Sequence, residues 1–334
     1  MRKLKRMSTV AVILAILFAF SAFSVNADEN EVYLGGQAFG VRFYADGAMI
    51  IKLEHYYDGQ KYVCPAKESG LKANDVIKKI NNKKISTNEE LKAEVENCGG
   101  KSILFEIERN GKIETKNINP IKNTVGVYLI GAWVRDSCAG IGTITYYDSS
   151  NNYFAALGHG ICDDETSALL PLKSGEVVKA QISGAEKSIC GKAGSLSGCF
   201  TEEIIGNLSK NTAMGVFGTT EDNFSEKTKY KIAETDEIKI GKALLYTTIE
   251  GKTPEQYQIE IKKLCNTNPD SNENFIIKIT DERLLEKCGG IVQGMSGSPI
   301  VQNGKIVGAV THVFVNNPKE GYGVFAQYMA DSYK

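Results

Sequence analysis

A serine stands between two glycines in the stretch GMSGSP, residues 294–299, which is a poor sequence for the interior of a helix or strand. A serine hydroxyl is a weak nucleophile and becomes effective only with a base within hydrogen-bond reach. The flanking glycines permit a sharp turn that presents Ser296 and lets backbone N–H groups converge on one point. We therefore interpret Ser296 as a candidate nucleophile; a polar surface turn is the alternative interpretation.

The chain has three histidines from which a base could come. His159 follows the apolar run YFAALG and precedes a glycine, a pattern that predicts a side chain at the end of a strand. We expect such a residue at the open edge of a barrel, and with Ser296 downstream we interpret His159 as the candidate general base. His55 lies beside two tyrosines in the N-terminal part and is predicted to be a surface residue.

The serine turn also predicts an oxyanion hole. The backbone N–H groups of Gly294 and Ser296 can both point at a developing negative charge, and a Cβ at position 294 would resist the required backbone angles. A third group, a carboxylate, should fix the tautomer of the histidine ring. Spacing alone does not choose among the aspartates between His159 and Ser296. Asp163 and Asp164 follow His159 so closely that we expect their side chains to point away into a loop. The candidates are Asp163, Asp164, Asp222, Asp236 and Asp281.

Short apolar runs separated by Gly, Asn and Asp fill the chain from residue 123 onward, with little helical periodicity. This pattern predicts an all-β barrel or sandwich, and about 210 residues suit two small β-barrels packed together. Asn303-Gly304 predicts a hairpin between SPIVQ and KIVGAVTHVFV.

Residues 31–121 have a mixed pattern that predicts a separate α+β unit. VRFYADGAMIIKL is interpreted as two strands around a turn, and Asn81-Asn82 as a further turn. Thr87 and Glu90 form a capping box that opens a helix through Glu96. Asn110-Gly111 predicts a hairpin after the strand that begins near Ile103.

Composition places the chain among folded globular proteins: of 334 residues 42% are hydrophobic and 24% charged, and 39 Lys and Arg balance 40 Asp and Glu. No basic stripe suggests a nucleic-acid partner, so none is expected. Residues 1–27 join a basic cluster to an apolar run over residues 9–25, which predicts a signal peptide or a membrane anchor and export of everything downstream. Whether the leader is removed stays open.

Eight cysteines are spread over the chain without a CxxC pair, which argues against a zinc cluster and favours small buried thiols for most of them. Cys190 and Cys199 are the pair for which we predict a disulfide. With three histidines and no HExxH motif, a metal hydrolase is also excluded, and we expect neither a metal nor a cofactor.

The N-terminal unit resembles a PDZ domain of the kind attached to exported serine proteases. The matching residues are Ala38, Phe39, Gly40 and Val41, at the place of the family's carboxylate-binding loop, and Pro65-Ala66, Gly70-Leu71 and Asn74-Asp75-Val76-Ile77. The resemblance implies that residues 38–41 receive a peptide carboxylate and that the peptide pairs with the adjoining strand edge. The alternative is that this groove only packs against the second domain.

The second domain, residues 123–334, resembles the stage IV sporulation protein B peptidase family. The resemblance rests on the stretches WVRDSCAGIGTITYYD, FAALGHGICD, KITDERLLEKCGGIVQGMSGSPIVQNGKIVGAVTHVFVN and GYGVFAQYM. It implies a mainly β fold, a chymotrypsin-like double β-barrel peptidase preceded by the α+β PDZ domain. It also implies a serine endopeptidase whose triad is Ser296, His159 and Asp281, although Asp281 lies closer to the serine than is usual for that class; a role in structuring the serine loop is the alternative.

In two-barrel proteases the strand after the serine hairpin borders the substrate cleft, so we predict that Thr311, His312 and Val313 pair with bound peptide. For His312, a hydrogen bond within the barrel wall is the alternative. The resemblance further implies export from the forespore into the space between its membranes, self-cleavage, and cleavage of the regulator of a membrane protease that activates a late sigma factor. A protein substrate, the chain itself and a PDZ-bound peptide are thus the expected partners.

Two other functional classes compete with this interpretation. An α/β-hydrolase needs its histidine after the serine and acid, whereas His159 precedes Ser296. An exported PDZ adaptor with an inactive protease fold would bind peptides without cutting them. The complete serine and histidine pair and both glycines of the turn argue against the adaptor.

Overall fold

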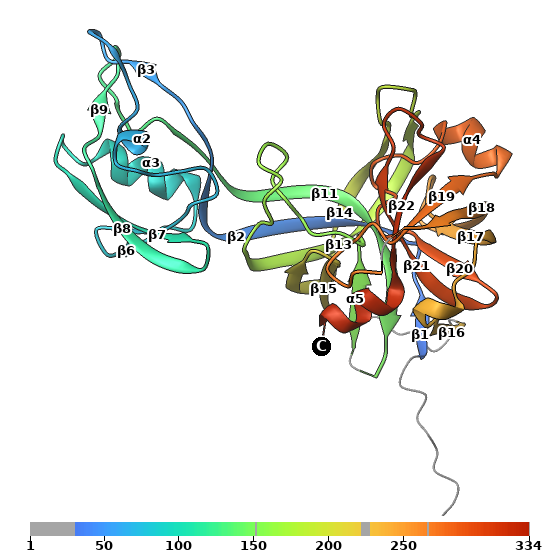
Figure 1. Ribbon diagram of the computed structural model, residues 1–334. Helices are drawn as coiled ribbons and strands as arrows, with labels where there is room; N and C mark the ends of the chain where they lie inside the picture. Colours follow the sequence, from blue (N-terminus) through green and yellow to red (C-terminus); the bar gives the residue numbers. More distant parts are fainter. Residues whose placement is uncertain (1–30, 151, 222–227, 266, 334) are drawn as a thin grey trace, which may run out of the picture. The chain divides into compact units, whose positions relative to one another are not determined.

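The computed structural model describes residues 31–150, 152–221, 228–265 and 267–333 (Figure 1). The predicted signal peptide or anchor, residues 1–27, lies outside these ranges. Every helix in the described part of the chain is too short or too polar to span a bilayer. Strands dominate, as the many short apolar runs predict, and their pairing defines two closed barrels and one smaller α+β unit.

The first barrel is closed by six strands in the order β2, β11, β12, β15, β14, β13, with β13 pairing back to β2. All six pairings are antiparallel. Phe39, Phe43 and Phe154 lie in its core and are almost fully buried. The strands are β2 (Ala38–Leu53), β11 (Ala132–Asp148), β12 (Tyr153–Ala156), β13 (Leu172–Glu186), β14 (Ser195–Thr212) and β15 (Gly215–Thr220).

The second barrel is also closed by six strands, in the order β17, β18, β19, β22, β21, β20. The hairpin predicted at Asn303-Gly304 is present between β20 and β21, and Asn303 has the left-handed φ of 51° that such turns favour. The strands are β17 (Gly241–Thr247), β18 (Glu255–Leu264), β19 (Phe275–Ile279), β20 (Pro299–Gln302), β21 (Lys305–Val313) and β22 (Glu320–Phe325).

The α+β unit is built on the last part of β2, which pairs with β5, and on the pairs β5–β7 and β7–β8. The predicted capping box is confirmed, because Thr87 accepts the Glu90 N–H at the start of α3 and Glu90 accepts the Thr87 N–H. The hairpin at Asn110-Gly111 is confirmed too. The elements are α2 (Pro65–Glu68), β5 (Val76–Ile80), β6 (Lys83–Lys84), α3 (Asn88–Glu96), β7 (Ile103–Arg109) and β8 (Lys112–Ile118).

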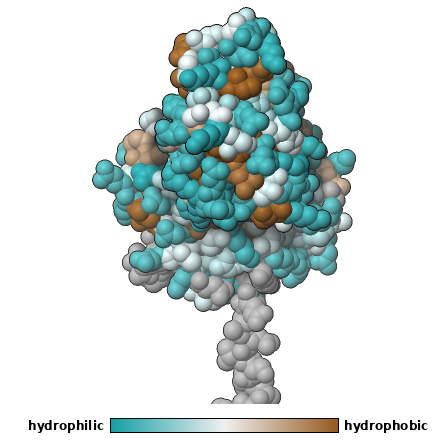
Figure 2. Space-filling model, turned by 90° about the vertical axis from the view of Figure 1, so that its left-hand side faces the viewer, coloured by the Kyte–Doolittle hydropathy of each residue, from teal (hydrophilic) through white to brown (hydrophobic). Residues whose placement is uncertain are grey.

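Shorter elements complete the described chain. α5 carries Tyr333, whose ring stacks on Tyr153 of the first barrel with centroids 4.0 Å apart. The elements are β1 (Glu31–Leu34), β3 (Tyr56–Tyr57), β4 (Tyr62–Val63), β9 (Ile121–Lys122), β10 (Tyr128–Leu129), β16 (Lys229–Ile232), the 3₁₀ turn η1 (Thr235–Glu237), α4 (Glu282–Cys288) and α5 (Ala326–Tyr333). The face in Figure 2 is mostly hydrophilic, with small separate hydrophobic spots.

The segment VRFYADGAMIIKL is not two strands around a turn. β2 runs through it as one strand of 16 residues, and Asp46-Gly47 lies where its register with β11 shifts. Four residues of β2, Ala45 to Ala48, there face the single residue Asp136. The turn signal in the sequence therefore produces a bulge, which bends a strand without ending it.

The prediction that residues 38–41 form a carboxylate-binding loop is also wrong. Residues 38–41 are central in the first barrel, where β2 pairs with β11 on one side and with β13 on the other. Phe39 and Val41 are buried in the barrel core, and Gly40 packs against the Phe200 ring. With both strand edges occupied, these residues cannot add a peptide strand, and the PDZ-like unit does not begin at residue 31.

Candidate active site

His159 and Ser296 line the same groove, which has a volume of about 1120 Å³. His159 lies three residues after β12 of the first barrel, and Ser296 lies three residues before β20 of the second. Residues 137 positions apart are thus brought to one site because one is placed at the end of a strand in each barrel. This is the juxtaposition that the sequence predicts.

The His159 ring is held by its own backbone neighbour. Its Nδ1 lies 2.8 Å from the carbonyl oxygen of Gly160, so Nδ1 carries the proton and Nε2 is left as an acceptor. Burial, with a smaller contribution from the nearby His312, lowers the pKa of His159 to about 4, although the hydrogen bond to the Gly160 carbonyl opposes this shift. The two rings have centroids 4.9 Å apart. The imidazole is therefore neutral at neutral pH, which is the protonation state a general base requires.

The Ser296 hydroxyl donates to the carbonyl oxygen of Thr311 at 2.8 Å. This contact holds the side chain against β21 in the resting protein. A base can take the hydroxyl proton only after the hydroxyl turns from the Thr311 carbonyl toward an imidazole nitrogen. The arrangement is thus a resting one, in which nucleophile and base share a groove without a direct hydrogen bond among the described residues.

The serine turn rests on β11 of the first barrel. Thr143 donates its side-chain hydroxyl to the Gly294 carbonyl at 2.8 Å and its N–H to the Ser296 carbonyl at 3.0 Å. Gly294 and Gly297 have φ angles of 98° and 92°, which other residues rarely adopt. A Cβ at Gly297 would also lie 2.0 Å from the Thr143 carbonyl oxygen. Both glycines that flank the serine are therefore required by this turn.

The two N–H groups predicted to form the oxyanion hole are free. In the described part of the chain, neither the Gly294 N–H nor the Ser296 N–H donates to an acceptor, whereas the N–H of Met295 between them donates to Val292. Unpaired donors beside a nucleophile are what an oxyanion hole needs. Their role as such stays a prediction.

A hairpin of the first barrel holds the segment that leads into the serine turn, and no pattern in the sequence indicates this contact. The connection between β13 and β14 carries the buried Ser188, whose hydroxyl donates to the Ile291 carbonyl and accepts the Gly194 N–H, both at 2.7 Å. Its N–H donates to the Cys288 carbonyl at 2.8 Å. A single serine in a polar connection has no local pattern that distinguishes it from a surface serine.

The structure does not bring Asp281 to the His159 ring. Asp281 is the N-cap of α4: it accepts the N–H of Arg283 at 3.0 Å and the N–H of Gln258 at 3.1 Å. The Arg283 guanidinium also holds the pKa of Asp281 below its usual value. Among the described residues no hydrogen bond joins Asp281 to His159. α4 ends at Cys288 and is capped by Gly289, after which the chain leads to Ser296, so this geometry fits the role of structuring the serine loop.

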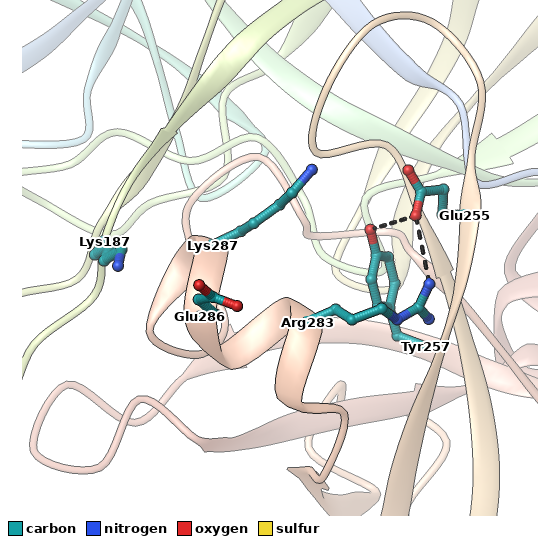
Figure 3. A pocket seen from close by; sticks show the side chains of 6 residues that line it. All are labelled: Lys187, Glu255, Tyr257, Arg283, Glu286 and Lys287. Atoms are coloured by element: carbon teal, nitrogen blue, oxygen red, sulfur yellow. Dashed lines mark hydrogen bonds and ion pairs between the residues drawn. The ribbon is translucent and has the colours of Figure 1, made fainter.

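The surroundings of α4 form a network of their own. Figure 3 shows a pocket in which Arg283 and Tyr257 both meet the Glu255 carboxylate, and the Arg283 guanidinium lies 4.9 Å from the centre of the Tyr257 ring. Lys187, Glu286 and Lys287 line the rest of it. Neither the candidate nucleophile nor the candidate base lines this pocket.

Asp163 and Asp164 do not point away from the site as expected, because both line the groove. Asp163 is buried, accepts hydrogen bonds from the N–H and hydroxyl of Thr166 and forms an ion pair with Arg135 of β11. Burial raises the pKa of Asp163, but the hydrogen bonds from Thr166 and Arg135 outweigh it and the net shift is downward. Asp163 thus ties the loop after His159 to β11. Of the other candidates, Asp236 lies in η1 and Asp222 lies outside the described residues.

Thr311, His312 and Val313 all line the groove, at the end of β21. The pairing of β21 with β20 reaches only Ala309, and Val310 then bonds the serine turn. Past that point no described strand pairs with this edge, so the backbone beside Ser296 is available for an extended peptide. Burial lowers the pKa of His312 as well. The placement suits the predicted peptide pairing, which stays a prediction.

The predicted disulfide is absent: all eight cysteines lie in the described ranges and all are free thiols. Cys190 and Cys199 are both exposed, and the Cys190 thiol donates to the Asn316 carbonyl. Cys138 and Cys162 line the groove. Burial raises the pKa of Cys138 to about 11, so this thiol is not a competing nucleophile.

Two six-stranded barrels, with a histidine from one and a serine turn from the other in the groove between them, define a chymotrypsin-like serine peptidase. A family model described as SpoIVB peptidase S55 matches residues 126–330, and a PDZ domain model matches residues 61–119. The chain therefore belongs to the SpoIVB peptidase S55 family and carries a PDZ domain.

Individual relatives are more distant. The chain is 42% identical over 67 residues to the "Probable protease eep" of Enterococcus faecalis, a match that covers 20% of this chain and 16% of that protein's length. The Rv3671c protease of M. tuberculosis is 12% identical over 58% of this chain and 80% of its own, with a TM-score of 0.33. The HtrA-type protease AlgW is 11% identical over 63% of this chain and 57% of its own, also with a TM-score of 0.33.

Proposed function

We propose that this chain is an exported serine endopeptidase of sporulation, which cleaves the regulator of an intramembrane protease and so triggers a late sigma factor. It would act in the space between the forespore membranes, with residues 9–25 as signal or anchor. Membership of the SpoIVB peptidase S55 family supports this proposal. The observation that carries its chemistry is the single groove that contains both His159 and Ser296.

The proposed reaction begins when the Ser296 hydroxyl leaves the Thr311 carbonyl and gives its proton to the neutral His159. Oγ then attacks the carbonyl carbon of the scissile peptide bond, and the N–H groups of Gly294 and Ser296 receive the developing oxyanion. The imidazolium returns the proton to the leaving amine, and the C–N bond breaks to give an acyl-enzyme. Water, activated by the same imidazole, hydrolyses that ester and restores the serine.

An endopeptidase assay tests this chemistry. The full chain is incubated with an unfolded polypeptide such as reduced casein, and new N-termini are identified by mass spectrometry. We expect internal cleavage by the wild type and none by Ser296→Ala or His159→Gln. Cleavage that persists in Ser296→Ala would place the nucleophile elsewhere, and a wild type that binds but never cuts would support the inactive PDZ adaptor.

The biological proposal needs a separate experiment. Self-cleavage is expected upstream of the barrels, so purified wild type should lose N-terminal segments during storage while Ser296→Ala stays intact. In a spore-forming host whose own copy is replaced by this chain, Ser296→Ala should block processing of the membrane-protease regulator and transcription from late mother-cell promoters. Normal late transcription with Ser296→Ala would refute the sporulation role and leave the peptidase assay unaffected.

A further inference from the structure

Two of the three histidines of the chain meet in the groove beside the nucleophile. His159 follows β12 of the first barrel, and His312 lies near the end of β21 of the second. Their ring centroids are 4.9 Å apart, and the ring planes are inclined by 32°. The reaction proposed above uses the His159 ring as the base and gives the His312 ring no part.

Both rings have a nitrogen that is free to bind a ligand. The Nδ1 of His159 donates to the Gly160 carbonyl, so its Nε2 keeps a lone pair. The His312 ring forms no hydrogen bond with any described residue, and burial alone shifts its pKa. His312 is also exposed, so its ring can rotate without displacing the barrel core. Two imidazole lone pairs are therefore available side by side.

The separation of the two rings suits a shared metal ion. Zinc binds an imidazole nitrogen at about 2.0–2.1 Å and prefers a tetrahedral arrangement of ligands. Since the centre of an imidazole ring lies about 1.2 Å behind the bound nitrogen, two rings on one zinc ion have centres about 5 Å apart. The observed 4.9 Å agrees with this value to within a small rotation of one side chain.

The contact of His159 with Gly160 has the form of the outer contact of a metal-bound histidine. Such a ring usually donates its other N–H to a carboxylate or a backbone carbonyl, which fixes its tautomer and orientation. His159 makes this contact at 2.8 Å. Burial also lowers the pKa of both rings below the ordinary value, so both are mainly neutral at neutral pH and protons do not compete with a metal ion.

The charges around the histidine pair favour a cation. The groove wall contains one arginine, Arg135, and two aspartates, Asp163 and Asp164. Arg135 forms an ion pair with the buried Asp163, which leaves the exposed Asp164 as the excess charge of the wall. The wall also contains two thiols, Cys138 and Cys162, and burial raises the pKa of both, so they are uncharged at neutral pH.

We propose that His159 and His312 together bind a divalent transition-metal ion such as Zn²⁺, and that this ion reversibly switches the peptidase off. The inference rests on the proposed function, because the ion would occupy Nε2 of His159, the atom that accepts the Ser296 proton. In the described part of the chain no group of three or more His, Cys, Asp or Glu side chains is arranged to hold a metal ion, so water completes the coordination. Two protein ligands make an exchangeable site, whereas structural zinc sites have four.

Binding is tested directly by the NMR signals of the histidine rings, because the chain has only three of them. The full chain, labelled with ¹⁵N-histidine, is titrated with ZnCl₂, and His312→Gln and His55→Gln assign the signals. We expect the His159 and His312 signals to change together in one transition. His55, which is exposed and does not line the groove, serves as the internal reference and should not change. A titration that changes only one groove ring, or neither, would overturn the proposal.

Inhibition is measured as the rate at which a fluorophosphonate, a small probe for activated serines, labels Ser296. Because zinc removes the general base, saturating zinc should lower this rate by about 100-fold or more, and EDTA should restore it. Mg²⁺, which prefers oxygen ligands, should have no effect at the same concentration. Unchanged labelling at a zinc concentration that saturates the NMR transition would contradict the switch.

His312→Gln and His55→Gln form a matched pair of variants, because each removes one exposed imidazole. Loss of even an outer partner of a metal ligand costs about 10–100-fold in affinity, so His312→Gln should raise the zinc concentration for half-inhibition by at least about tenfold. His55→Gln should keep the wild-type value. Each rate is compared with the zinc-free rate of the same variant, since His312 also borders the predicted peptide site. Equal zinc sensitivity in His312→Gln and the wild type would refute the shared site.

Exposed thiols are the competing zinc ligands, and Cys162 is the exposed thiol that lines the groove. Cys162→Ser should keep the wild-type zinc sensitivity. If Cys162→Ser lost its zinc sensitivity while His312→Gln retained it, the ion would be held by the thiol and the histidine pair would be the wrong site.

Failure of this proposal and failure of the proposed function are distinguishable. If the fluorophosphonate labels Ser296 in the wild type and zinc leaves the rate unchanged, the metal switch is wrong and the proposed peptidase stands. If the wild type is not labelled even in EDTA, the proposed function fails, and the histidine signals still show whether the pair binds zinc.

Discussion

The neutral state of His159 should persist far into acid, and this can be measured as the rate at which a fluorophosphonate labels Ser296. Burial lowers the pKa of His159 from an ordinary value of 6.5 to about 4. At pH 5 a base with a pKa of about 4 is about 90% deprotonated, whereas a base with the ordinary pKa is about 3% deprotonated. We therefore expect the labelling rate at pH 5 to stay within a factor of about two of its plateau at pH 8.

The same shift has a consequence for stability. Between pH 6.5 and pH 4 the unfolded chain binds a proton at His159 that the folded chain does not bind. The contribution of His159 to the free energy of unfolding is therefore fully present above pH 6.5 and is lost as the pH falls toward 4. Relative to His159→Gln, the wild type should lose about 2 kcal/mol of unfolding free energy between pH 7 and pH 5. Urea unfolding followed by circular dichroism at both pH values measures this difference.

Two results would refute the reasoning on His159. One is a labelling rate that has fallen to a few per cent of its plateau at pH 5 while circular dichroism still shows folded protein. The other is an equal pH dependence of unfolding in the wild type and His159→Gln. Either result would mean that the ring is solvated, and that the groove does not exclude water from the base.

Three substitutions test the supports of the serine turn. Asp281→Ala should cost about 1 kcal/mol of unfolding free energy by removing the α4 cap, and should slow Ser296 labelling without abolishing it. If the variant instead kept its stability and lost labelling as completely as His159→Gln, this would indicate that Asp281 contacts the base directly. Ser188→Ala leaves the buried Gly194 N–H and the buried Ile291 carbonyl unpaired, so a loss of about 2 kcal/mol of unfolding free energy and slower labelling are expected. Unchanged thermal unfolding would mean that the Ser188 hydrogen bonds do not support the segment before the serine turn. Gly294→Ala must place an alanine at a φ of 98°, which costs about 1–2 kcal/mol of unfolding free energy. The rate of Ser296 labelling should fall by a larger factor than this loss of stability explains. A normal labelling rate would show that the turn tolerates a Cβ.

Local signals in the sequence were sufficient where the structure is locally determined. The capping box at Thr87 and Glu90 and the hairpins at Asn110-Gly111 and Asn303-Gly304 depend on residues within a few positions of each other. The role of Gly294 and Gly297 beside Ser296 was also predictable from the local sequence, because a turn with positive φ angles needs glycine.

The errors have a common physical cause, which is that the deciding partner is distant in the chain. Residues 38–41 match a PDZ loop in type, but their neighbours are β11 and β13, about 100 and 140 residues away. The family resemblance implies that Asp281 is the triad acid, yet the Gln258 N–H and the Arg283 side chain donate to its carboxylate. No pattern within one segment reveals which strand or side chain arrives from elsewhere.

The most direct test of the central claim, that His159 and Ser296 act as one unit, is to map the site of fluorophosphonate attachment by peptide mass spectrometry. The account predicts a single adduct on the peptide containing Ser296 in the wild type, and no adduct there in His159→Gln that is otherwise folded. An adduct on another residue, or undiminished labelling of Ser296 in His159→Gln, would contradict it.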